Sequence, residues 1–136
     1  MMSSNVAGHP STRILVVDDS DIVRRSLRHL LEAQDQWRVC AEATNGREAV
    51  AKVEQSHPDV ILLDLQMPGM NGLEAAREIR RRSPAIPILM VTMHACPQLT
   101  DEARKIGIRG TCAKTDINCV VEAVQTLLNN GTYYQN

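Results

Sequence analysis

The sequence has little of several features that would point to particular classes of protein. It contains no phenylalanine, and aromatic residues make up only 2% of its 136 residues, so a core must be built from aliphatic side chains and methionine. Its net charge is only -1, which gives no general positive field to attract nucleic acid or an anionic membrane. No apolar run approaches the ~20 residues of a membrane-spanning helix, and the first dozen residues lack the apolar core of a signal peptide. These absences predict a cytoplasmic protein with no membrane partner.

Cysteine is present but follows no ligand pattern. Cys40, Cys96, Cys112 and Cys119 form no C-x-x-C pair and stand at no repeated spacing from histidine. Neither a zinc site nor a disulfide framework is therefore favoured. We expect small buried or half-buried thiols.

The organisation of the chain is that of one domain. Hydrophobic residues make up 43% of the sequence, which is enough for a core in a chain of this length. Residues 1–12, rich in Ser, Gly, Asn and Pro, are expected to form a disordered leader. Residues 13–129 are the expected domain, and residues 130–136 are a polar tail or the start of a linker.

Apolar runs of strand length alternate with segments of helical periodicity. Strands are expected at 13–17, 38–43, 59–63, 86–91 and 110–113. Helices are expected at 21–34, 46–55, 72–82, 98–107 and 117–131, with Asn45 and Asn71 as N-caps. The runs are continuously apolar, which is typical of strands covered on both faces of a parallel sheet. The prediction is an α/β fold, a doubly wound five-stranded parallel sheet with five helices.

Polar side chains stand where four of these strands end. Asp18 and Asp19 follow the first, Asp64 the third, Thr92 the fourth and Lys114 the fifth. In open α/β sheets this edge is where ligands bind. Three crowded carboxylates repel one another unless a cation lies among them, and a set of oxygen ligands alone suits Mg²⁺. An ammonium and a hydroxyl beside such a cation suit the oxygens of a phosphoryl group, so we predict an aspartate that accepts one as an acyl phosphate.

The segments "VVDDS", "LLDLQMPGMNG", "VT" and "AK", in this order and spacing, closely resemble the receiver domain of two-component response regulators. The resemblance runs from residue 13 to about 129 and implies a flavodoxin-like fold. It implies that Asp64 is the phosphoacceptor, that Thr92 is a switch hydroxyl and that Lys114 contacts the phosphate. The Mg²⁺ ligands that it implies are Asp18, Asp19, Asp64 and the backbone carbonyl of Gln66.

The segment "GIRGTCAKTD" is similar to the LuxR-type (NarL/FixJ) subfamily, in which a DNA-binding half would follow a tail such as this one. The resemblance implies a sensor histidine kinase as phosphoryl donor and allows a homodimer on phosphorylation. DNA would be bound only through an output domain that these 136 residues do not include. The domain would be no conventional enzyme, but a signalling domain that catalyses its own Mg²⁺-dependent phosphorylation and dephosphorylation.

Three positions depart from the family pattern or leave alternatives open. Thr111 stands where the family usually has Tyr or Phe as a rotating switch. Thr115 stands where many members have a cis-proline, so either the site stores the cost of a cis bond, about 2.5 to 4 kcal/mol, or the loop differs. His94 either borders the site and tunes the lifetime of the phosphoryl group or is an exposed loop imidazole.

Two other classes of function share part of this residue set. A haloacid-dehalogenase-like phosphatase also uses a strand-end aspartate and Mg²⁺, but it needs a second acid two residues later, where this chain has Gln66. A degenerate receiver would act only as a binding module and would lack one of the five site residues, all of which are present.

The basic stretches at 24–29 and 77–82 are interpreted as solvated helix faces, although family members dock their kinases on the first helix.

Overall fold

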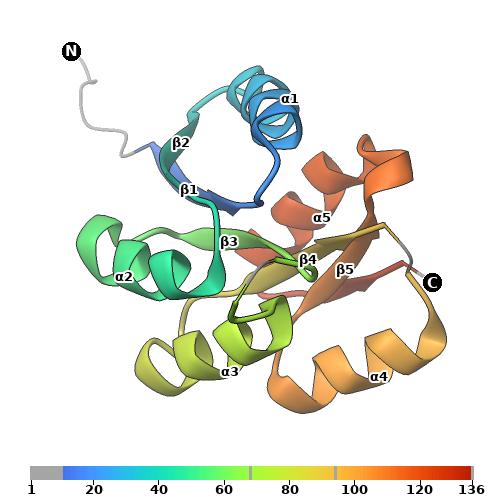
Figure 1. The fold of residues 1–136 in the computed structure, drawn as a ribbon. Helices are drawn as coiled ribbons and strands as arrows, with labels where there is room; N and C mark the ends of the chain where they lie inside the picture. The colour runs from blue at the N-terminus through green and yellow to red at the C-terminus, as the bar shows by residue number, and fades with distance from the viewer. Residues whose placement is uncertain (1–10, 68, 94, 136) are drawn as a thin grey trace.

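The chain folds as a parallel sheet with helices on both faces (Figure 1). A computed structural model describes residues 11–67, 69–93 and 95–135. The strands are β1 (Thr12–Val17), β2 (Trp37–Ala43), β3 (Val60–Asp64), β4 (Ile88–Thr92), β5 (Gly110–Ala113) and β6 (Tyr133–Tyr134). The α-helices are α1 (Asp21–Glu32), α2 (Gly46–Ser56), α3 (Gly72–Arg82), α4 (Pro97–Ile106) and α5 (Cys119–Leu128), and a short 3₁₀ helix covers Lys114–Asp116.

The sheet has six strands in the order β2-β1-β3-β4-β5-β6, and each neighbouring pair is parallel. The prediction of five strands was therefore wrong by one, because Tyr133 and Tyr134 pair with Gly110 and Thr111. Gly110 allows this close approach, since a Cβ atom there would lie only 2.6 Å from the carbonyl oxygen of Tyr133. A strand of two residues carries no periodic pattern that could have predicted it.

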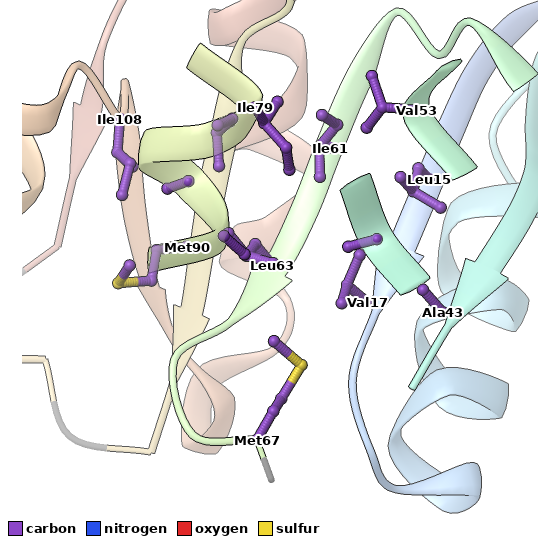
Figure 2. Close-up of a cluster of buried hydrophobic side chains, with 14 of the residues drawn as sticks. Leu15, Val17, Ala43, Val53, Ile61, Leu63, Met67, Ile79, Met90 and Ile108 are labelled. Atoms are coloured by element: carbon purple, nitrogen blue, oxygen red, sulfur yellow. The ribbon is translucent and has the colours of Figure 1, made fainter. Parts of the chain in front are cut away.

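Both faces of the sheet are buried, which explains the continuous apolar runs. Alternate strand residues point to opposite faces. On one face they pack against α2, α3 and α4 (Figure 2), and they include Leu15, Val17, Ile61, Leu63, Ile88 and Met90. On the other face they pack against α1 and α5, and they include Ile14, Val16, Val60, Leu62, Leu89 and Val91. The aliphatic core expected from the composition is confirmed.

Local capping fixes where several helices begin and end. The side chains of Asn45 and Asn71 accept hydrogen bonds from the third residue of α2 and α3, so both predicted N-caps are confirmed. Asn71 and Glu74 form a reciprocal capping box. Gly107 ends α4 with a φ of 102°, a left-handed conformation that favours glycine.

The first turn of α1 exposes one large apolar side chain. Ile22 is 75% exposed, whereas Leu27 and Leu31 of the same helix are buried. All four cysteines are free thiols, with Cys112 and Cys119 buried and the other two half-buried.

None of the helices in the described part of the chain has the length and apolar character needed to cross a bilayer.

Candidate functional site

The predicted site residues meet at one edge of the sheet because β1, β3, β4 and β5 are consecutive neighbours. Asp64 and Thr92 are the last residues of β3 and β4, while Asp18 and Lys114 directly follow β1 and β5. The carboxyl ends of parallel strands share an edge, so these four side chains converge. Their strand-end placement is therefore confirmed.

Lys114 joins two acids in the centre of the site. Its Nζ lies 2.7 Å from Oδ2 of Asp18 and 3.0 Å from Oδ1 of Asp64. The acids are almost fully buried, at 1% and 4% exposure, and the lysine side chain is 14% exposed. Buried carboxylates need such a partner because desolvation strongly disfavours an isolated charge. This contact joins the carboxyl ends of β1, β3 and β5, and it reaches across β4, which lies between β3 and β5 in the sheet.

An open cavity of about 430 Å³ lies over the buried pair. It is lined by Asp19, Asp64, Gln66, Met67, Thr92, Met93 and Lys114. Thr92 is buried, whereas Asp19 and the side chain of Gln66 are exposed. The backbone N–H of Gln66 donates a hydrogen bond of 3.4 Å to Oδ1 of Asp64. The site thus offers a buried carboxylate, a hydroxyl and an ammonium to one solvent-accessible space.

The charges of the site follow from this burial. Burial raises the pKa of the Asp64 carboxyl above its ordinary value, and the Asp18 carboxylate adds to this, while the hydrogen bond from Lys114 lowers it. Burial alone would lower the pKa of Lys114, but its contacts with Asp18 and Asp64 outweigh that effect and the pKa is raised. Lys114 is therefore a stable cation at neutral pH. A buried carboxylate that has a shifted pKa and lies in a cleft is a candidate functional residue.

The three carboxylates also form a candidate metal centre. Asp18, Asp19 and Asp64 each offer one oxygen, and these oxygens lie within 4.8 Å of one another. A donor set made only of oxygen atoms suits a hard divalent cation such as Mg²⁺ rather than zinc. The residues present therefore fit the cation that the sequence predicts.

Asp18 is fixed by a residue that the sequence interpretation missed. Arg24 donates from Nη1 to the backbone oxygen of Asp18 at 2.6 Å and from Nε to Oε1 of Glu42 at 3.0 Å. Its side chain is only 12% exposed, so the view of residues 24–29 as a solvated face is wrong for Arg24. The sequence signal that could have indicated this role is the position of Arg24 in the first turns of α1, close to the acidic residues at the end of β1. Ser20 caps α1, while Oδ1 of Asp18 accepts from the Ser20 N–H at 2.9 Å.

The loop after β5 resolves one of the open alternatives. Among the described residues no peptide bond is cis, so the Lys114-Thr115 bond is trans and the loop differs from the cis-proline pattern. A 3₁₀ turn over Lys114–Asp116 takes its place, and α5 begins only at Cys119. The prediction for His94 lies outside the described residues.

Gly72 holds the β3-α3 loop against the site. A Cβ atom at this position would lie 2.3 Å from the backbone oxygen of Asp64 and 2.8 Å from Cα of Leu65. The Gly72 N–H donates to the backbone oxygen of Leu65 at 2.8 Å. Glycine is therefore required by close packing at the residue that carries the central carboxylate.

We expect Gly72→Ala to lower the free energy of unfolding by about 1–3 kcal/mol, because the methyl group must displace the β3 backbone. Helix propensity alone would raise stability by up to about 1 kcal/mol, so the two effects have opposite signs. Urea unfolding measures the difference. Ala85→Ser, which adds one heavy atom at an exposed loop position, should change stability by less than about 0.5 kcal/mol. A Gly72→Ala protein as stable as the parent would contradict the packing argument.

Comparison with known proteins identifies the family and supports the fold. Residues 14–125 match the response regulator receiver domain. The chain belongs to this family. A crystal structure of a LuxR-family two-component response regulator from an Aurantimonas species superposes on the receiver domain with a TM-score of 0.87 and 35% identity. That match covers 90% of this chain and 89% of the other, so the LuxR type predicted from "GIRGTCAKTD" is supported as well.

Curated relatives agree with the receiver assignment. The transcriptional regulatory protein DegU of Brevibacillus brevis is 32% identical over 122 residues, covering 89% of this chain and 52% of its own length. The transcriptional regulatory protein LnrK of Bacillus subtilis is 36% identical over 120 residues, covering 88% of this chain and 54% of its own length. The receiver domain thus spans about half the length of these relatives.

Proposed function

We propose that this receiver domain is phosphorylated on Asp64 and so switches the activity of an output domain or partner. The observation that carries the proposal is the contact of Lys114 with Asp18 and Asp64 beneath an open cavity. One oxygen of the Asp64 carboxylate attacks the phosphorus of the donor. The bond between phosphorus and the donor's nitrogen or oxygen breaks, and an acyl phosphate forms on Asp64. Attack by water on that phosphorus later releases inorganic phosphate and restores the carboxylate.

The other side chains have separate roles in this step. Lys114 lies within contact of Asp64, so it can pair with an oxygen of the incoming phosphoryl group. Thr92 lines the same cavity and can donate its hydroxyl proton to another phosphoryl oxygen. Asp18, Asp19, Asp64 and the carbonyl of Gln66 would hold Mg²⁺. When bound, the cation would neutralise negative charge on the phosphoryl oxygens.

The proposed donor is a sensor histidine kinase, consistent with membership of the receiver family. Ile22 gives α1 an exposed apolar residue beside the site, since Asp18 and Asp19 lie just before this helix. That surface is suited to a protein contact. Homodimerisation on phosphorylation and location in the cytoplasm stay predictions. DNA binding would belong to an output domain of the kind expected in transcriptional regulators such as DegU and LnrK.

The phosphatase alternative fits less well. Its leaving-group acid would stand two residues after Asp64, and that position is Gln66, whose amide cannot donate a proton as a general acid. A binding module without phosphorylation is also disfavoured, because Asp18, Asp64, Thr92 and Lys114 are all gathered at one sheet edge. A signalling receiver therefore gives a role to each of these side chains.

Treatment with acetyl phosphate and Mg²⁺ tests the proposal. Intact-protein mass spectrometry should show the gain of one phosphoryl group, and fragmentation after borohydride reduction should place it on Asp64. Chelation of the divalent cation should prevent the gain, because the clustered carboxylates then have no counter-cation. A phosphoryl group mapped to a serine, threonine or histidine would contradict the assignment.

A further inference from the structure

The residue that follows β6 contacts the turn that carries Lys114. Tyr134 pairs with Thr111, and the next residue, Gln135, continues the ladder, its N–H donating to the backbone oxygen of Thr111 at 2.9 Å. The Thr111 hydroxyl donates to the backbone oxygen of Gln135 at 3.1 Å. Thr111 is fully buried, so its hydroxyl needs such a partner. The residue at the family's aromatic position thus fastens β6 to β5.

The Gln135 side chain then spans the Lys114 turn. Its Oε1 accepts from the backbone N–H of Ala113 at 2.8 Å and from Sγ of Cys119 at 3.4 Å. Its Nε2 donates to Oδ2 of Asp116 at 3.1 Å. These partners stand immediately before Lys114, at the end of its 3₁₀ turn and at the start of α5.

An amide is suited to this position because it accepts and donates at the same time. A carboxylate could accept a hydrogen bond from Ala113 but would repel Asp116. A hydrocarbon side chain could neither accept from Ala113 nor donate to Asp116. The end of a short strand needs only backbone hydrogen bonds to continue the ladder. The side-chain contacts of Gln135 therefore point to a role beyond strand pairing.

We propose that Gln135 is a positioning residue for Lys114, and that it couples β6 to the phosphoryl site. The amide holds both ends of the turn, and the turn holds the ammonium between Asp18 and Asp64. Linkage makes this coupling reciprocal, so the free energy by which a change at Asp64 alters the contacts of Gln135 equals that by which loosening Gln135 alters the site. The effect on phosphoryl transfer rests on the function proposed above. The positioning of Lys114 does not.

Two variants and one control test the proposal in the full chain. Gln135→Ala removes every side-chain contact to the turn, while Gln135→Glu keeps the acceptor for Ala113 and loses the donor to Asp116. Tyr133→Phe is the control, because it removes a hydrogen bond of 3.2 Å from the same strand to Glu122 without touching the Lys114 turn. Nitrogen NMR of the Lys114 ammonium, identified by its loss in Lys114→Met, reports the position of the charge. Acetyl phosphate kinetics report the chemistry.

We expect Gln135→Ala to shift or broaden the Lys114 signal and to slow phosphorylation about three- to tenfold, as for the loss of one or two hydrogen bonds. Gln135→Glu should also slow phosphorylation, whereas Tyr133→Phe should leave both measurements unchanged. An unchanged Lys114 signal in Gln135→Ala would overturn the positioning role. A shifted signal with a parental rate would overturn the coupling to phosphorylation. If the parent protein gains no phosphoryl group, the proposed function fails, and the Lys114 signal still decides the positioning role.

Discussion

Asp64→Asn is expected to abolish the phosphoryl gain from acetyl phosphate, because a carboxamide does not act as the nucleophile here. The change is nearly isosteric, and Asp64 lies in a buried position 3.0 Å from Lys114. Asp18, the other buried acid of the site, does not line the cavity in which the donor would bind. Asp18 is more deeply buried and is occupied by Lys114 and the Ser20 N–H. Intact mass after incubation with acetyl phosphate and Mg²⁺ is the measurement.

The same variant also has an expected effect on stability. Burial raises the pKa of Asp64, so at neutral pH the folded state holds an ionised carboxylate at a cost that the unfolded state does not have. Asparagine removes that cost. Without a divalent cation, the variant should therefore unfold at a urea concentration no lower than that of the parent, which excludes misfolding as the cause of lost phosphorylation. Asp101→Asn, on the exposed face of α4, should keep the parental phosphoryl gain. Phosphorylation of Asp64→Asn would remove Asp64 from its proposed role.

The central strands and their strand-end residues could be predicted because each depends on local pattern. A continuous apolar run predicts a strand buried on both faces, and the residue after it must lie at the sheet edge. Asp64, Thr92 and Lys114 follow from this rule without any knowledge of side-chain contacts. The helix boundaries at Asn45 and Asn71 were predictable for the same reason, since a capping side chain acts within three residues.

What could not be predicted depends on contacts between distant segments. The pairing of β6 with β5 needs the close approach of Tyr133 over Gly110, some twenty residues earlier in the chain. Arg24 looked like one charge among several in a basic stretch, yet its guanidinium turns inward to Asp18 and Glu42. Ile22 fits the apolar period of α1 but lies beyond the edge of the core. Charge and period alone do not say which way such a residue faces.

Thr111 shows how one departure from a family pattern acquires a structural reason. An aromatic side chain there would have no hydroxyl beside the strand backbone, whereas Thr111 exchanges hydrogen bonds with Gln135. The end of β5 is therefore connected to β6, and β6 to the turn of Lys114. These hydrogen bonds form a continuous connection from the Lys114 turn to Gln135, which is the contact that the proposed coupling requires.

Lys114→Met is expected to slow phosphorylation about 10²-fold, the effect typical of losing one preorganised charge or donor in a reaction site. Methionine has a similar length and keeps the apolar part of the side chain, so the 3₁₀ turn should persist. Among the described residues, Lys114 is the only cationic side chain within 4 Å of the carboxylate oxygens of Asp18 and Asp64, and the substitution removes it. Quantified phosphoprotein as a function of time with acetyl phosphate and Mg²⁺ gives the rate constant.

Affinity for Mg²⁺ should change in the opposite direction. The Lys114 ammonium lies 2.7 Å and 3.0 Å from two carboxylates of the candidate metal centre, so it repels a second cation that uses the same oxygens. Its removal leaves two buried carboxylates without a cationic partner. Mg²⁺ should then bind at least about fivefold more tightly, since ~1 kcal/mol is the repulsion of two unit charges at 4 Å in water. Calorimetric titration measures this, with Lys105→Met on the exposed surface of α4 as the matched control. Slower phosphorylation together with tighter Mg²⁺ binding would show that the variant has lost the charge and kept the fold. An unfolded site would lose both phosphorylation and Mg²⁺ binding. A parental rate with parental Mg²⁺ affinity would place Lys114 outside the chemistry of the site.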